Sequence, residues 1–121
     1  MAHKILVVDD EPWLTELSSE ALAQAGFEIT MASTVDKALA ALAARDFSAI
    51  LSDIRLPGVD GLRFYQALTE RFPLATRHFG FYTAYDDEMA RQFIGARDIP
   101  LLRKPCRLRE LEDFVIRLIS R

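Results

Sequence analysis

Short apolar runs alternate along the chain with longer segments in which apolar residues recur at helical spacing. The first run, Ile5 to Val8, has four apolar residues in succession, as a strand covered on both faces of a parallel sheet requires. Further strands are predicted at 27–32, 49–53, 78–82 and 99–103. A helical pattern follows each strand. The chain is therefore predicted to be an α/β protein of five strand–helix units, with right-handed crossovers that place helices on both faces of a parallel sheet.

Cap and turn residues locate the predicted helices. Pro12 suits the first turn of a helix that Gly26 ends. Ser33 or Thr34 is predicted to cap the second helix, with Asp36 in capping-box spacing from Ser33. The other three helices are predicted at 61–71, from a cap at 85–87 to near residue 95, and at 108–118.

Two residues go against the usual composition of a strand. Gly80 lies inside the fourth predicted strand, where glycine is unfavourable unless another group approaches the backbone closely. Pro100 lies in the fifth and is tolerable only near its beginning or on a sheet edge. We therefore expect another group to approach the backbone closely at Gly80, and we expect Pro100 to lie near the beginning of its strand or on a sheet edge.

Composition and charge exclude several classes of protein. The 121 residues suffice for one domain with a substantial core and are too few for two. A net charge of −3 argues against a general nucleic-acid binder, and no apolar run approaches the roughly 20 residues that span a bilayer. The single cysteine, Cys106, excludes an internal disulfide and suits a reducing compartment, so a cytoplasmic location is expected.

Charged side chains follow three of the predicted strands directly. Asp9 and Asp10 follow the first strand, Asp53 ends the third, and Lys104 follows the fifth. In an open parallel sheet the carboxyl ends of the strands share one edge, so we expect these four side chains to meet there. Three neighbouring carboxylates need cations, and Lys104 with one Mg²⁺ balances their charge. The convergence predicts a magnesium site.

An aspartate in such a site can act as a nucleophile and carry a phosphoryl group as an acyl phosphate. Mg²⁺ and Lys104 would neutralise the phosphoryl oxygens, and the Thr83 hydroxyl, at the end of the fourth strand, can donate to another. Each feature also has a plainer interpretation. The run from Asp9 to Glu11 is typical of a helix N-terminus, Thr83 of a turn, and Lys104 of a surface lysine.

Four motifs occur in order and at regular spacing over essentially the whole chain. They resemble the motifs of the receiver domain of two-component response regulators. The motifs are Asp9-Asp10, Asp53 followed by Leu56-Pro57-Gly58 and Asp60-Gly61, Thr83-Ala84, and Lys104-Pro105.

This resemblance implies a flavodoxin-like fold, a five-stranded parallel sheet of order 2-1-3-4-5. It implies that Asp53 accepts a phosphoryl group from a histidine kinase or a histidine phosphotransfer domain. Asp9 and Asp10 would bind Mg²⁺ together with Asp53 and the backbone carbonyl of Arg55. Residues 1–121 would form a single receiver domain with no output domain in the chain.

The resemblance also assigns roles at the other strand ends. Thr83 would be the switch hydroxyl and Lys104 would contact the phosphoryl group, with a cis bond between Lys104 and Pro105. The domain would assist its own phosphoryl transfer and dephosphorylation without being a dedicated enzyme. Phosphorylation would change the face formed by the fourth helix, fifth strand and fifth helix, toward an unknown output partner; homodimerisation is left open. Candidate residues on that face are Met89, Phe93, Arg107 and Arg109.

One position departs from the pattern of such receivers, and two others bear on the lifetime of the phosphoryl group. Leu101 stands where such receivers usually carry tyrosine or phenylalanine, three residues before the lysine, so a coupled movement of Thr83 and an aromatic ring is not expected. Arg55 and Tyr85 lie two residues beyond Asp53 and Thr83, where the resemblance implies that side chains flank the phosphoryl group. Bulky side chains there predict a slowly hydrolysed phosphoaspartate.

Three other functions compete with this interpretation. A flavodoxin-type binder of flavin or nucleotide would need a glycine- or serine-rich phosphate loop after the first strand, where this chain has Asp-Asp-Glu-Pro. A phosphohydrolase would need a general-acid carboxylate two residues after Asp53, where Arg55 stands, and usually a cap domain. A receiver-like module that binds partners without being phosphorylated remains an alternative, against which the intact acidic set argues.

Overall fold

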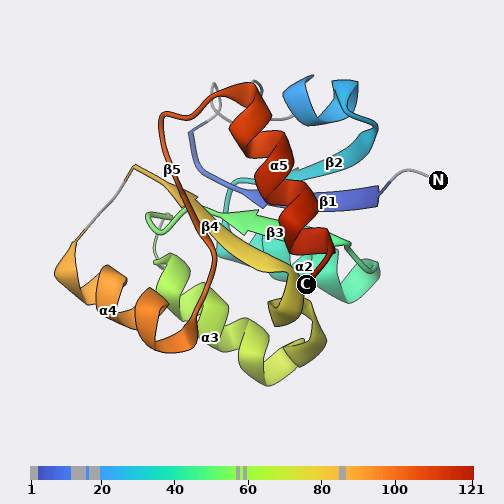
Figure 1. The fold of residues 1–121 in the computed structure, drawn as a ribbon. Helices are drawn as coiled ribbons and strands as arrows, with labels where there is room; N and C mark the ends of the chain where they lie inside the picture. Colours follow the sequence, from blue (N-terminus) through green and yellow to red (C-terminus); the bar gives the residue numbers. More distant parts are fainter. Residues whose placement is uncertain (1–2, 12–15, 17–19, 57, 59, 85–86) are drawn as a thin grey trace.

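The computed structural model describes residues 3–11, 16, 20–56, 58, 60–84 and 87–121. All strand pairs in its one five-stranded sheet are parallel, and the order is β2-β1-β3-β4-β5 (Figure 1). This confirms the predicted flavodoxin-like sheet. The strands are β1 (His3–Val8), β2 (Phe27–Ala32), β3 (Ala49–Ser52), β4 (Phe79–Thr83) and β5 (Leu101–Arg103).

Helices cover both faces of the sheet, as Figure 1 shows for α5 on one face and α3 and α4 on the other. Residues 20–24, within the first predicted helix, are also helical, and Gly26 follows them with φ +92°. Among the described residues, no helix is both long and apolar enough to cross a bilayer. The other helices are α2 (Val35–Ala44), α3 (Gly61–Arg71), the 3₁₀ helix η1 (Pro73–His78), α4 (Glu88–Arg97) and α5 (Leu108–Ile119).

Alternation of side chains along β1 divides the core into two layers. Leu6 and Val8 face α2, α3 and α4, whereas Ile5 and Val7 face α5 and the helical residues 20–24. Successive strand side chains point to opposite faces, so a strand buried on both sides must be apolar throughout. The continuous apolar run of β1 is explained by this double burial.

Some element ends agree with the predicted ones and others differ. Of the two predicted caps of α2, Ser33 and Thr34, the structure has Thr34, whose hydroxyl accepts the N–H of Lys37. Helix α4 continues to Arg97 and ends at Asp98, which adopts a left-handed φ of 52°. Strand β5 begins only at Leu101, so Pro100 precedes it, and η1 was not predicted from the sequence.

Two glycines allow close packing where any side chain would collide. A Cβ atom on Gly80 would lie 2.7 Å from the ring of Phe114 in α5, which explains glycine inside β4. A Cβ atom on Gly61 would lie 2.3 Å from the carbonyl oxygen of Asp53 and 2.9 Å from the Cα of Ile54. The N–H of Gly61 instead donates to the Ile54 carbonyl at 2.5 Å, so the start of α3 is held against the segment that follows β3. Gly61 thus helps to fix the backbone beside Asp53.

Candidate functional site

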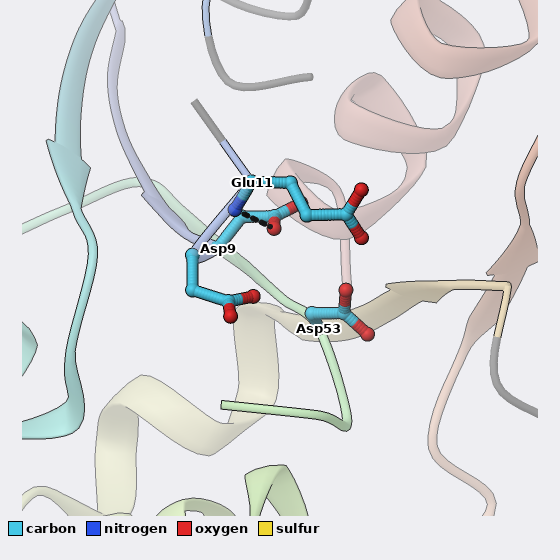
Figure 2. Close-up of side chains that lie close together, drawn as sticks. Asp9, Glu11 and Asp53 are labelled. Atoms are coloured by element: carbon cyan, nitrogen blue, oxygen red, sulfur yellow. Dashed lines mark hydrogen bonds between the residues drawn. The ribbon is translucent and has the colours of Figure 1, made fainter. Parts of the chain in front are cut away.

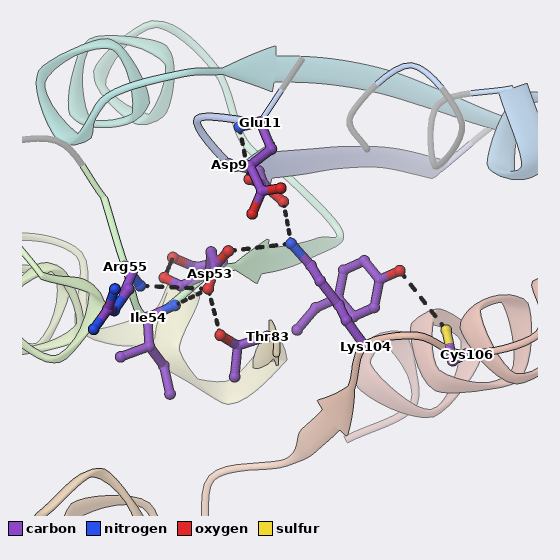
Figure 3. A network of polar contacts seen from close by, with 10 residues as sticks. Asp9, Glu11, Asp53, Ile54, Arg55, Thr83, Lys104 and Cys106 are labelled. Carbon is purple, nitrogen blue, oxygen red and sulfur yellow. Dashed lines mark hydrogen bonds and ion pairs between the residues drawn. The ribbon is translucent and has the colours of Figure 1, made fainter. Parts of the chain in front are cut away.

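The predicted side chains meet at the carboxyl edge of the sheet. Asp9 follows β1, Asp53 follows β3, Thr83 ends β4 and Lys104 follows β5. Figure 3 shows them converging from these separate strands. The prediction that Asp9, Asp10, Asp53 and Lys104 meet is confirmed, because parallel strands deliver their ends to one edge. The Thr83 hydroxyl joins them at Asp53.

Lys104 bridges two buried carboxylates. Its Nζ lies 2.6 Å from Oδ2 of Asp9 and 3.1 Å from Oδ2 of Asp53, and all three side chains are at most 6% exposed. Burial by itself lowers the pKa of Lys104. The hydrogen bond to Asp9 and the negative charges of Asp53 and Asp9 outweigh that effect, so its pKa lies above the usual 10.5. Lys104 is therefore a fixed positive charge within the acidic site.

The Asp53 carboxylate accepts hydrogen bonds on both oxygens. Oδ1 accepts the backbone N–H groups of Ile54, at 2.7 Å, and Arg55, at 3.3 Å, and the hydroxyl of Thr83. Oδ2 accepts from Lys104. These donors come from the turn after β3 and from the carboxyl ends of β4 and β5, so they orient the carboxylate and stabilise its charge.

Four carboxylates form the acidic cluster, which comprises Asp9, Asp10, Glu11 and Asp53. One ligand oxygen from each lies within 4.8 Å of the others. Asp9 and Asp53 are buried, and Asp10 and Glu11 are exposed. Figure 2 shows Glu11 directed toward the same region as Asp9 and Asp53. The sequence indicated a helix-terminal role for Glu11; its position directly after Asp10 was the only signal of a place in the site.

A cavity of about 230 Å³ opens beside Asp53 and is lined by Glu11, Asp53, Arg55, Thr83 and Ala84. The presence of Arg55 in its wall agrees with the expectation that this side chain flanks the reactive carboxylate. Tyr85, the other residue expected there, lies outside the described residues. The cavity gives a small group access to Asp53.

The acidic cluster fits a hard divalent cation. Mg²⁺ prefers carboxylate oxygens and water, and buried and exposed carboxylates here combine with one fixed ammonium group. Asp9, Asp10, Glu11 and Asp53 could therefore hold Mg²⁺. The role of the Arg55 carbonyl as a further ligand stays a prediction.

Two expectations concern the chain around Lys104. The Lys104–Pro105 bond is cis, as the resemblance implied. Leu101 is half-buried, pairs with Phe81 in the sheet and packs against the core layer of α2, α3 and α4. It therefore fills a position beside β4 without offering an aromatic ring.

Comparisons with known proteins agree with this geometry. Response regulator protein FleR of Pseudomonas aeruginosa is 35% identical over 118 residues, which are 97% of this chain and 24% of FleR. Transcriptional regulatory protein AruR of the same organism is 33% identical over 129 aligned positions, covering all of this chain and 51% of AruR. The chain thus spans about a quarter to a half of these relatives.

A solved structure shares the fold. The CheY-like response regulator receiver domain protein of Methanospirillum hungatei superposes with a TM-score of 0.89 at 22% identity, over 99% of this chain and 95% of that one. Residues 5–116 match the family described as the response regulator receiver domain. With the sheet order, the strand-end side chains and this match in agreement, the chain belongs to the response regulator receiver domain family.

Proposed function

We propose that Asp53 accepts a phosphoryl group from the phosphohistidine of a histidine kinase or phosphotransfer protein, in a Mg²⁺-dependent reaction. The observation that carries this proposal is the position of Asp53 beside an open cavity, with Lys104 and Thr83 both contacting its carboxylate. Membership of the receiver family supports it.

The chemistry follows from the groups around Asp53. A carboxylate oxygen attacks the phosphorus, the bond from phosphorus to the histidine nitrogen breaks, and the imidazole leaves with the electron pair of that bond. The product is an acyl phosphate. Positioning and charge neutralisation supply most of the help in phosphoryl transfer, and this site provides both.

Lys104 and Thr83 stabilise the negative charge of the incoming phosphoryl group. Lys104 lies 3.1 Å from Asp53 and keeps its proton, because its pKa is raised. The hydroxyl of Thr83 already reaches the same carboxylate and can donate to a phosphoryl oxygen instead. A bound Mg²⁺, held by Asp9, Asp10 and Asp53 with the Arg55 carbonyl, would supply the further positive charge that the phosphoryl oxygens require.

Phosphorylation then changes the surface by which the domain binds partners. The new charge at Asp53 attracts Thr83 and Lys104, which lie at the ends of β4 and β5. We propose that the adjoining face of α4, β5 and α5 responds. Met89, 74% exposed at the start of α4, and Leu108, 57% exposed at the start of α5, offer apolar contact surface there.

The test is incubation with Mg²⁺ and acetyl phosphate, followed by intact-mass measurement. The wild-type protein should gain one acid-stable, base-labile phosphoryl group, and Asp53→Asn should gain none. Asp36→Asn, which changes an exposed aspartate in α2, is the matched control and should behave as wild type. No gain of mass by the folded wild-type protein would favour the partner-binding module that is not phosphorylated.

A further inference from the structure

Lys104 has an aromatic neighbour besides the two carboxylates. Its Nζ lies 4.9 Å from the centroid of the Tyr82 ring, over the ring face. A cation within about 6 Å of an aromatic centroid is attracted by the negative face of the ring, more strongly where both groups are withdrawn from water. The Lys104 side chain is 5% exposed and Tyr82 is 8% exposed. The contact is therefore a buried cation–π pair within the site.

The sheet places Tyr82 beside Lys104. Tyr82 pairs with Leu102 across β4 and β5, and the N–H of Lys104 continues this ladder by donating to the Thr83 carbonyl at 2.9 Å. Residues two apart in a strand point to the same face, so Lys104 lies diagonally opposite Tyr82 on the side that α5 covers. Tyr82 thus reaches Lys104 from the core layer of α5, and not from the acidic edge of the sheet.

The Tyr82 ring is itself held in place. It belongs to the buried core layer that includes Leu111 and Val115 of α5. Its hydroxyl accepts a hydrogen bond from the Cys106 thiol, with 3.8 Å between oxygen and sulfur. The stem of a lysine is flexible, and a fixed ring beside it limits the positions that its ammonium group can adopt.

Lys104 needs such a constraint because two carboxylates compete for it. Nζ lies 2.6 Å from Asp9 and 3.1 Å from Asp53, so the ammonium group is closer to Asp9 (Figure 3). Phosphoryl transfer requires positive charge beside Asp53, where the phosphoryl oxygens arrive. We propose that Tyr82 is a positioning residue whose ring face keeps the ammonium group of Lys104 between these carboxylates, within reach of the phosphoryl group; this rests on the proposed function.

The first measurement is the rate at which the full 121-residue chain gains a phosphoryl group from acetyl phosphate in saturating Mg²⁺, followed by intact mass. Tyr82→Leu removes the ring and should react about fivefold more slowly, a change equivalent to about 1 kcal/mol. Tyr82→Phe keeps the ring and removes only the hydroxyl, so it should react at close to the wild-type rate. Phe79→Leu, which removes a buried ring at the other end of β4, is the matched control and should also react as wild type.

NMR of the lysine side chains tests the contact itself. The chain has three lysines, and Lys4 and Lys37 are exposed, so labelling lysine with ¹³C gives a small set of signals. The ring current of an aromatic side chain shifts protons over its face upfield. The ε-methylene signal of Lys104, assigned by elimination with Lys4→Met and Lys37→Met, should therefore lie upfield of the other two in wild type. It should stay there in Tyr82→Phe and move toward them in Tyr82→Leu, a pattern that a merely structural role of Tyr82 would not produce.

Each contrary result has a definite meaning. A wild-type Lys104 signal that coincides with those of the exposed lysines would overturn the inference, even if Tyr82→Leu fails to fold. If wild type is phosphorylated and Tyr82→Leu reacts no more slowly than Phe79→Leu, the inference is overturned and the proposed function stands. A Tyr82→Phe rate as low as that of Tyr82→Leu would assign the effect to the hydroxyl and would also overturn it. Absence of phosphorylation in wild type would overturn both the inference and the proposed function.

Discussion

Replacing Lys104 by methionine tests the electrostatic organisation of the site most directly. Methionine preserves the length and apolar stem of the side chain and removes the ammonium group. The two carboxylates that Lys104 contacts, Asp9 and Asp53, are 4% and 6% exposed. They would then face each other without the cation that now lies between them.

The expected loss follows from the two contacts. At an effective dielectric constant of about 20, unit charges 2.6 and 3.1 Å apart attract each other by about 6 and 5 kcal/mol. Desolvation of the three groups offsets much of this attraction, and removal of one partner from a buried pair typically costs about 3–5 kcal/mol. We expect Lys104→Met to lower the free energy of unfolding by about 3 kcal/mol at pH 7 in EDTA.

Urea denaturation followed by circular dichroism measures this loss, with Lys4→Met, an exposed lysine of β1, as the control. The wild-type protein, the control and Lys104→Met should have equal m-values, so that the midpoints report stability alone. If Lys104→Met loses no more than the Lys4→Met control, the ion pairs do not stabilise the fold and the reasoning is refuted.

The pH dependence of the free energy of unfolding gives an independent check that the ion pairs of Lys104 stabilise the fold. The pKa of Lys104 is raised above the usual 10.5 in the folded protein, so the stability that the ion pairs contribute is complete below that pH. It is lost as the pH rises through the folded-state pKa. The difference in stability between wild type and Lys104→Met should therefore stay constant from pH 8 to about pH 10 and shrink above pH 10.5.

Three further substitutions test the surroundings of the site. Gly61→Ala should lower the free energy of unfolding by about 2–3 kcal/mol, because its Cβ would collide with backbone atoms of Asp53 and Ile54. Gly80→Ala should cost about 1–2 kcal/mol in the same urea assay, because the Phe114 ring can shift. Arg55→Ala should speed dephosphorylation, measured as loss of the phosphoryl mass with time, since Arg55 lines the approach to Asp53; an unchanged rate would remove Arg55 from that role.

The residues at the strand ends are the part of the site that could be predicted from the sequence. Asp9, Asp10, Asp53 and Lys104 were predicted to meet because they follow or end apolar runs, and parallel strands place such residues on one edge. Thr83 was predicted to offer its hydroxyl from the end of the fourth strand. Glu11 was not assigned to the site. Its position after β1 is visible in the sequence, but the direction of its side chain depends on the backbone conformation of residues 9–11, where the Glu11 N–H contacts Asp9.

The sequence pattern predicted the ends of helices and strands less well, because packing decides where these elements begin and end. The fifth strand was predicted to begin at Ile99, yet β5 begins at Leu101, and Ile99 joins the core without belonging to the strand. Pro100 directly precedes this edge strand, which agrees with the expectation that it is tolerable only near the strand's beginning or on a sheet edge. The 3₁₀ helix η1 carries no periodic signal of its own. Its turns depend on contacts with α3 and α5 that no local pattern encodes.

The sequence by itself determined the α/β class, the order of the elements along the chain and the residues at the carboxyl edge of the sheet. The spacing of apolar residues, and the place of a charged residue at the end of an apolar run, are local properties of the chain. Only the tertiary structure decided which oxygen meets which donor. The closer contact of Lys104 with Asp9 than with Asp53 joins residues far apart in the chain. The three donors on one oxygen of Asp53 depend on the turn after β3, which the hydrogen bond of Gly61 with Ile54 holds in place. Distances of this kind are set by the packed chain as a whole, and they decide the electrostatics of the site.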